Sequence, residues 1–203
     1  MKRVRKGQAG YVKYERVKRL LITLLMFALP LGLYFIGIVV TGSNKNILTV
    51  VSVVGILPAA RAMVSWIMTM LSKEAPEEII ACTEKNAGSL VHGFELMVTA
   101  YEGRMPLDAV VVCGNNVACY ATYGKSEQDE FMQTHIEKIL ATNGYRGVKA
   151  KIFRSRKQYE ERIVSLTEHA ESLREGIKCT PDPKYPDLNR DEMVLHTIMA
   201  IAI

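Results

Sequence analysis

The chain has 203 residues, a net charge of +5 and 49% hydrophobic residues. About a quarter of the chain is apolar enough for lipid, so roughly 130 residues remain for one modest domain. The charge is unevenly placed along the chain, so the total does not indicate a protein that is basic throughout and binds nucleic acid.

Two long apolar runs, residues 20–41 and 47–71, dominate the first third of the chain. A bilayer core of about 30 Å needs roughly 20 apolar helical residues, and each run reaches that length. The short polar segment 42–46 can only reverse the chain direction, so the pattern predicts a transmembrane helical hairpin. The alternative is a cleaved signal peptide over 20–41. That run is longer than a signal core of about 7–15 residues, and a second span follows directly.

The residues before the first run predict the orientation of the hairpin. Eight basic residues and one acidic residue, Glu15, precede residue 20, whereas the chain from Lys73 onward has 16 basic and 20 acidic residues. Short basic flanks remain cytoplasmic, and two spans return the chain to the same side. We therefore expect an inner or plasma membrane protein with both termini in the cytoplasm. Its expected parts are a basic tail over 1–19, spans over about 20–41 and 47–71, and a domain over 76–203.

The basic tail, residues 1–19, has two compatible interpretations. A topogenic flank explains its charge. The tail is also suited to bind anionic lipid, at about 1 kcal/mol for each basic residue near the surface. Anionic lipid headgroups are therefore expected partners, together with the bilayer itself, and nucleic acid is not.

Arg61 is the one charged residue inside the two apolar runs. At 1.5 Å per helical residue it lies roughly 20–22 Å from the outer turn, nearer to the cytoplasmic side. An arginine at this depth can extend its guanidinium toward phosphates or water, and an intramembrane charge is also a candidate for function. The pattern favours the first role and leaves the second open.

The first half of the expected domain combines a helix with three strands. Pro76 and the acids after it favour a helix start. Residues 107–113 form an almost continuous apolar run, which predicts a strand buried on both faces, and Gly114 with Asn115 and Asn116 suits a hairpin turn. The expected elements are a helix over 76–91 and strands over 94–101, 107–113 and 117–123, with a break at 103–106.

The second half adds helices around a fourth strand. Ser126 is expected to cap a helix that ends at Asn143 and Gly144. Charged and apolar residues alternate over 148–153, which predicts a strand with one buried face. The remaining expected elements are a helix over 156–174, a Pro-rich linker over 179–187 and an apolar helix capped by Asn189. That last helix is expected to dock on the domain, with the membrane surface as the alternative. The predicted fold class is thus a membrane α-helical hairpin plus a cytoplasmic α/β (αβββαβα) domain.

The element order over roughly 76–155 resembles the core of the restriction-endonuclease-like (PD-(D/E)xK) superfamily, which includes membrane-tethered members. In that family an acid at the start of the second strand and an E-x-K pair on the third hold a divalent metal. The segment MPLD (105–108) places Asp108 at the first position, whereas the third-strand positions are Ala121 and Tyr123. One carboxylate cannot hold Mg²⁺ well, because the ion prefers several oxygen ligands. The resemblance implies a degenerate core with Asp108 as its single candidate catalytic residue, and no metal or cofactor is expected.

A second resemblance rests on LPAAR (57–61) and MPLDAVVV (105–112). This pair is similar to a group of small, uncharacterised bacterial two-span membrane proteins that are loosely labelled O-linked GlcNAc-transferase-like. The resemblance implies architecture only. The chain has no DxD motif, no repeats and no room for a nucleotide-sugar fold, so the transferase label is set aside.

A basic cluster between residues 146 and 157 is the densest charged feature of the domain. It consists of Arg146, Lys149, Lys151, Arg154, Arg156 and Lys157. The cluster suits a solvated strand edge, a contact with anionic lipid under the anchor, or a contact with an RNA-like polyanion. The sequence as a whole favours a membrane-anchored, non-enzymatic interaction or regulatory module with a membrane or cytoplasmic protein partner. The alternative is a divergent metal-dependent nuclease or hydrolase tethered to the membrane. Oligomeric state stays open.

Overall fold

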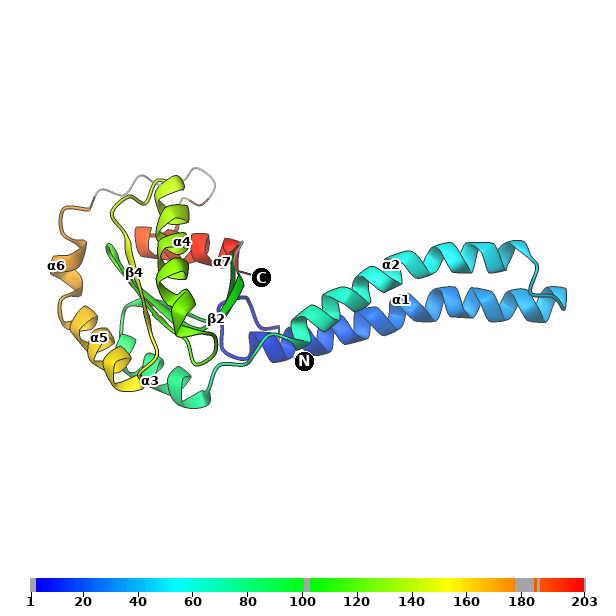
Figure 1. Cartoon of the computed structure of the whole chain (residues 1–203), viewed down its shortest axis with the longest axis horizontal. Coiled ribbons are helices and arrows are strands. Elements are labelled where there is room, and N and C mark those ends of the chain that lie inside the picture. Colours follow the sequence, from blue (N-terminus) through cyan, green and yellow to red (C-terminus); the bar gives the residue numbers. More distant parts are fainter. Residues whose placement is uncertain (1–2, 101–102, 178–184, 186, 203) are drawn as a thin grey trace. The chain divides into compact units, whose positions relative to one another are not determined.

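The computed structural model describes residues 3–100, 103–177, 185 and 187–202. The chain forms two compact units (Figure 1). The hairpin unit comprises residues 12–73. The α/β domain combines the segment up to Tyr11 with the chain from Glu74 onward. The predicted tail, residues 1–19, is therefore shared between the two units.

The hairpin unit consists of α1 (Tyr11–Thr41) and α2 (Ile47–Met70), and both helices are long and apolar enough to cross a membrane. Most of their large apolar side chains are exposed, which distinguishes them from the core helices of a soluble domain. Helix α1 begins well before residue 20. Glu15 contributes to this extension, because it pairs with Lys18 at 3.0 Å and Arg19 at 2.9 Å, at helical spacings of three and four residues.

Two arginines of α1 join the base of the hairpin to the end of α2. Arg19 Nη1 donates to Ser65 Oγ at 2.5 Å and to the Ser65 carbonyl at 3.3 Å. Arg16 Nε donates to the Thr69 carbonyl at 3.4 Å, and its Nη2 donates to the Ser72 carbonyl. The last carbonyls of a helix lack intrahelical partners and favour positive charge. Part of the basic flank therefore holds the hairpin together.

The α/β domain is built on one four-stranded sheet with the strand order β1-β2-β3-β4. The first three strands are antiparallel, and β4 is parallel to β3. The domain elements are α3 (Glu77–Ala87), β1 (Val91–Ala100), β2 (Gly103–Cys113), β3 (Asn116–Tyr120), a 3₁₀ turn (Ser126–Gln128), α4 (Asp129–Thr142), β4 (Lys149–Phe153), α5 (Arg156–Glu168), α6 (Ala170–Arg174) and α7 (Arg190–Ile201).

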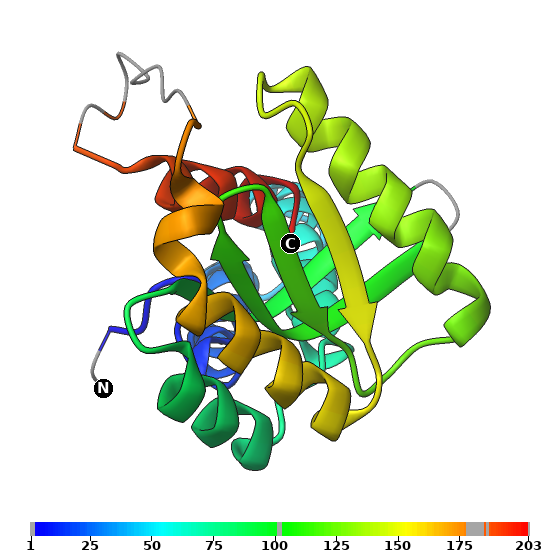
Figure 2. The ribbon, with the colours of Figure 1, turned by 90° about the vertical axis from the view of Figure 1, so that its left-hand side faces the viewer.

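Helices cover both faces of the sheet (Figure 2). Helices α4 and α7 pack on one face, where Ile136 and Ile198 join the core, and α3 and α5 pack on the other, around Tyr159. Residues 107–113 are buried throughout, as expected for a strand covered on both sides. Cys113 and Cys119 are buried in opposite core layers.

The chain itself covers parts of both edges of the sheet. At the β4 edge, side chains of α4 accept from two outward backbone N–H groups: Glu137 from Ala150 at 3.0 Å and Gln133 from Ile152 at 3.2 Å. At the β1 edge, residue 7 bridges to Phe94 and residue 202 bridges to Val98. Unpaired edge groups invite pairing with other chains. These contacts therefore restrict strand addition to this domain.

The N-terminal segment, residues 3–10, belongs to this edge. The Phe94 N–H donates to the Gly7 carbonyl at 2.8 Å, and Lys6 Nζ donates to the Ala202 carbonyl at 2.6 Å. Gly7 has a φ of +87°, and a Cβ there would lie 2.7 Å from Met199 Sδ. Only glycine meets both requirements without strain.

Several predicted boundaries differ from the structure. Residues 103–106 belong to β2 and do not break the sheet. Pro106 is tolerated because β3 pairs only with Ala109–Cys113, which leaves β1 as the single neighbour at that point. Ser126 lies inside the 3₁₀ turn and does not cap α4. The predicted helix 156–174 is divided at His169 into α5 and α6.

Other boundaries also shift. The predicted helix 76–91 already ends at Ala87, the first strand begins at Val91, and the third strand ends at Tyr120. Most of the predicted linker 179–187 lies outside the described residues.

Two local predictions are confirmed. On β4 the lysines Lys149 and Lys151 are exposed, whereas Ala150 and Ile152 are buried. Asn189 caps α7 in a full capping box with Glu192. Helix α7 docks on the domain through Val194, Leu195 and Ile198, so the membrane-surface alternative for this helix is wrong.

Candidate functional site

Asp108 lies in the middle of β2 and is almost completely buried, with 2% of its surface exposed. One carboxylate oxygen, Oδ2, accepts from the backbone N–H of Thr122, two residues beyond the end of β3, at 2.6 Å. Burial raises the pKa of the Asp108 carboxyl, although the hydrogen bonds from Thr122 and the charge of Arg154 act in the opposite direction. Part of the carboxylate is thus committed to fixing the loop after β3.

Arg154 follows β4 and is the basic residue that acts on Asp108. Its guanidinium makes a two-point contact with Asp129, with distances of 2.8 Å from Nε and 2.6 Å from Nη2, and Nη1 donates to the Gly124 carbonyl at 2.9 Å. Paired N–H donors on one carboxylate form a strong, directional contact. Arg154 therefore links the end of β4 to the start of α4 and to the loop beyond β3.

Glu95 on β1 is a second acidic candidate, which the sequence pattern alone did not single out. The pairing of Phe94 with Ala109 and of Leu96 with Leu107 places Glu95 opposite Asp108. Glu95 is buried and has a φ of +56°, the one positive φ among the described residues other than glycine. A side chain in this region costs about 1–3 kcal/mol, and such strain is concentrated at functional sites.

At Glu95 on β1, and opposite it on β2, the regular alternation of side chains between the two faces of the sheet is interrupted. Phe94 and Leu96 are two residues apart yet pack in opposite core layers, and Leu107 and Ala109 show the same offset on β2. Regular alternation would place each pair on one face. The sequence pattern does not reveal this offset, because apolar residues stand on both sides of each acid.

The residues around Asp108 do not match a divalent-metal site. The positions corresponding to the family's E-x-K pair hold Ala121, which is fully buried in the core, and Tyr123, which is partly exposed beyond β3. The carboxylate of Asp129 is paired with the guanidinium of Arg154. Across the described residues, no group of three or more Asp, Glu, His or Cys side chains is placed to bind a metal ion.

The basic cluster is only partly available as positive surface. Arg154 pairs with Asp129, Arg156 with Glu78 at 2.8 Å, and Lys149 with Glu137 at 3.4 Å. Lys151 Nζ lies 5.2 Å from the centre of the Phe153 ring. The other two residues of the cluster, Arg146 and Lys157, make no ion pair with any described residue.

Arg61 is exposed on the outer surface of α2. Within the part of the chain that the structure describes, its guanidinium has no hydrogen-bond or ion-pair partner. Both roles considered for this residue therefore remain predictions.

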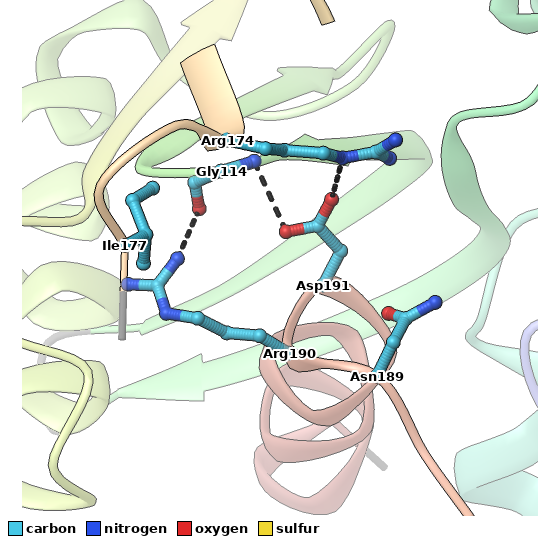
Figure 3. A pocket seen from close by; sticks show the side chains of 6 residues that line it. All are labelled: Gly114, Arg174, Ile177, Asn189, Arg190 and Asp191. Atoms are coloured by element: carbon cyan, nitrogen blue, oxygen red, sulfur yellow. Dashed lines mark hydrogen bonds and ion pairs between the residues drawn. The ribbon is translucent and has the colours of Figure 1, made fainter. Parts of the chain in front are cut away.

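A small cavity of about 220 Å³ lies where α7 begins (Figure 3). Asp191 accepts from the Gly114 N–H at 3.0 Å and from Arg174 at 2.8 Å, while Arg190 donates to the Gly114 carbonyl at 2.8 Å. Gly114 cannot be replaced easily, because a Cβ there would clash with the Leu173 carbonyl oxygen. The polar groups drawn at the centre of this cavity form hydrogen bonds with one another. These hydrogen bonds hold the start of α7 against the turn between β2 and β3.

No family model matches the chain, and no curated protein or solved structure matches it significantly.

Proposed function

We propose that the protein is a membrane-anchored, non-enzymatic interaction or regulatory module that presents its α/β domain at the cytoplasmic face. The observation that carries this proposal is the insertion of the hairpin into the domain. The chain leaves the domain at Tyr11, immediately after the contact between Gly7 and Phe94, and returns at Glu74. The domain is thus attached to its anchor by two covalent connections.

This insertion supports the proposed topology independently of hydropathy. Residues on both sides of the hairpin fold into one domain, so both must lie on the same side of a membrane, which two crossings achieve. A cleaved signal peptide would remove the segment that pairs with β1. The excess of basic residues before α1 favours the cytoplasmic side.

Labelling of single cysteines in intact cells tests the topology. Asn44→Cys, in the turn between the helices, should react with an external thiol reagent, and Tyr185→Cys should not. Cys82, Cys113 and Cys119 are buried and should stay unreactive, so only Cys179 needs replacement by serine. External labelling at position 185 would overturn the proposed orientation.

The non-enzymatic assignment is supported by the structural contacts that Asp108 and the nearby Asp129 make. The Thr122 N–H and Arg154 engage Asp108 and Asp129 respectively. A pull-down of the full chain in mild detergent would identify the partner that such a module requires.

A divergent metal-dependent hydrolase is the second candidate, and the strained, buried Glu95 opposite Asp108 favours it. The element order α3-β1-β2-β3-α4-β4 also agrees with the expected nuclease-like core. This candidate requires metal-dependent hydrolysis of a nucleic acid by the purified full chain that is lost in Asp108→Ala. Such a result would replace the non-enzymatic proposal.

A further inference from the structure

The N-terminal segment, residues 3–10, forms one wall of a hollow in the α/β domain. The segment is held at Gly7 by β1 and at Lys6 by the Ala202 carbonyl. It also turns on itself, since the Gln8 N–H donates to the Arg5 carbonyl at 3.1 Å and the Arg5 N–H donates to Gln8 Oε1 at 2.8 Å. The wall is thus fixed by backbone and side-chain contacts before any ligand binds.

The hollow has a volume of about 600 Å³ and combines three elements. The N-terminal segment contributes Arg3, Arg5 and Gln8, α3 contributes Glu84, and β1 contributes His92 and Phe94. The volume lies within the range of small-molecule sites. His92 lines one side, and its ring lies edge to face with the buried ring of Phe94, with centres 5.4 Å apart.

The charges in the hollow favour an anion with hydroxyl groups. Arg3 and Arg5 are exposed, and neither guanidinium has an ion-pair partner among the described residues. Guanidinium groups match phosphate oxygens in pairs. Glu84 is the one carboxylate in the lining and is exposed on α3. It repels a bare anion but accepts hydrogen bonds from hydroxyl groups.

We propose that this hollow binds a phosphate group carried on a polyol, such as a glycerol phosphate headgroup. Arg3 and Arg5 hold the phosphate, Glu84 accepts from hydroxyl groups, and the carbon skeleton lies against the His92 ring. The ligand can be a lipid headgroup or a soluble polyol phosphate, because both present the same groups.

The lipid source follows from the proposed function and depends on it. The wall of the hollow reaches Ala9, and α1 begins two residues later at Tyr11. If α1 spans the membrane, the hollow is joined to a membrane-entering helix by a very short piece of chain. Binding of a soluble polyol phosphate requires no membrane. The proposed binding site and the proposed membrane-anchored function can therefore fail separately.

Two binding measurements on the full chain test the site. In the first, nanodiscs of phosphatidylcholine contain the same fraction of either phosphatidylglycerol or phosphatidylserine, and native mass spectrometry counts the lipids that stay bound. Both lipids carry one net negative charge, but only phosphatidylglycerol has the polyol. In the second, glycerol 3-phosphate is titrated into the chain in a neutral detergent.

Phosphatidylglycerol should be retained about tenfold better than phosphatidylserine, or glycerol 3-phosphate should bind saturably in detergent. Either result supports the site and identifies its source. Arg3→Gln with Arg5→Gln should lower that binding about tenfold. The matched control, Lys125→Gln with Lys138→Gln, removes the same charge from exposed positions outside the hollow and should leave it unchanged. Equal retention of the two lipids without binding of glycerol 3-phosphate, or equal losses in both double variants, would overturn the proposal.

Discussion

Glu95 on β1 and Asp108 on β2 are both buried and lie at the point where side-chain alternation slips on both strands. A charged carboxylate loses its hydration when it is buried, and this costs free energy. Burial raises the pKa of the Asp108 carboxyl, which lowers this cost because the protonated form carries no charge. The arrangement therefore makes the stability of the domain depend on pH.

Asp108→Asn should stabilise the domain at neutral pH. The folded-state pKa of Asp108 lies above its unfolded value, so the unfolded chain loses its proton first as pH rises. The free energy of unfolding therefore falls between about pH 4 and the raised pKa, by about 1.4 kcal/mol for each unit of the shift. Asparagine keeps an acceptor for the Thr122 N–H and cannot ionise. Urea unfolding of the full chain in a non-ionic detergent should show the advantage of the variant growing as pH rises.

Asp129→Asn provides the contrast for this prediction. It weakens the two-point contact with Arg154 and should destabilise the domain at pH 7. If Asp108→Asn also destabilises the chain at every pH, the carboxylate is held charged and the interpretation of its burial is wrong.

Among the elements, α1 combines the basic residues on which the proposed orientation rests with side-chain contacts to α2. In the proposed topology its basic residues act by charge alone, and any lysine or arginine would suffice for that purpose. The contacts from Arg16 and Arg19 to Ser65, Thr69 and Ser72 require the guanidinium shape and reach. Two substitutions that each remove one positive charge, only one of them from a contact with α2, can therefore separate the two roles.

Arg19→Gln should lower the stability of the hairpin by about 2 kcal/mol, because its hydrogen bonds from a charged group to Ser65 and Glu15 are lost. Lys13→Gln removes the same charge from an exposed position in the same helix and should have little effect. Thermal unfolding of both variants in detergent, followed by circular dichroism, makes the comparison. Equal effects would mean that the contacts to α2 contribute nothing.

At the scale of the whole molecule, the helical hairpin interrupts the sequence of the α/β domain. Residues 3–11 and the chain from Glu74 onward share one fold although the hairpin separates them. Edge strands depend on pairing or cover to remain soluble. A chain that starts at residue 76 therefore lacks part of the cover over β1.

Replacing residues 12–73 with a flexible glycine–serine linker should yield a soluble domain that unfolds in one cooperative step. The chain 76–203 alone should be less stable by about 1–3 kcal/mol and more prone to aggregate, because the Phe94 N–H and the Ala202 carbonyl lose their partners. Urea unfolding and light scattering compare the two chains. Equal stability would show that the N-terminal segment is not a working part of the domain.

Local features of the fold could be predicted from the sequence because they depend on neighbouring residues. The two apolar runs predicted the helical hairpin by length, the alternation over 148–153 predicted β4, and Asn189 predicted the start of α7. Each follows from helical or strand periodicity or from capping chemistry.

Only the tertiary structure decided the long-range features. Residue 7 pairs with β1 through its backbone, and Lys6 reaches the Ala202 carbonyl across 196 positions. Backbone hydrogen bonds do not depend on the identity of the side chains. The sequence therefore could not show that part of the basic tail pairs with β1. The same holds for the candidate site. Asp108 was visible as an acid in an apolar strand, but its opposition to Glu95 depends on strand register and on one strained φ, which exist only after the strands have paired.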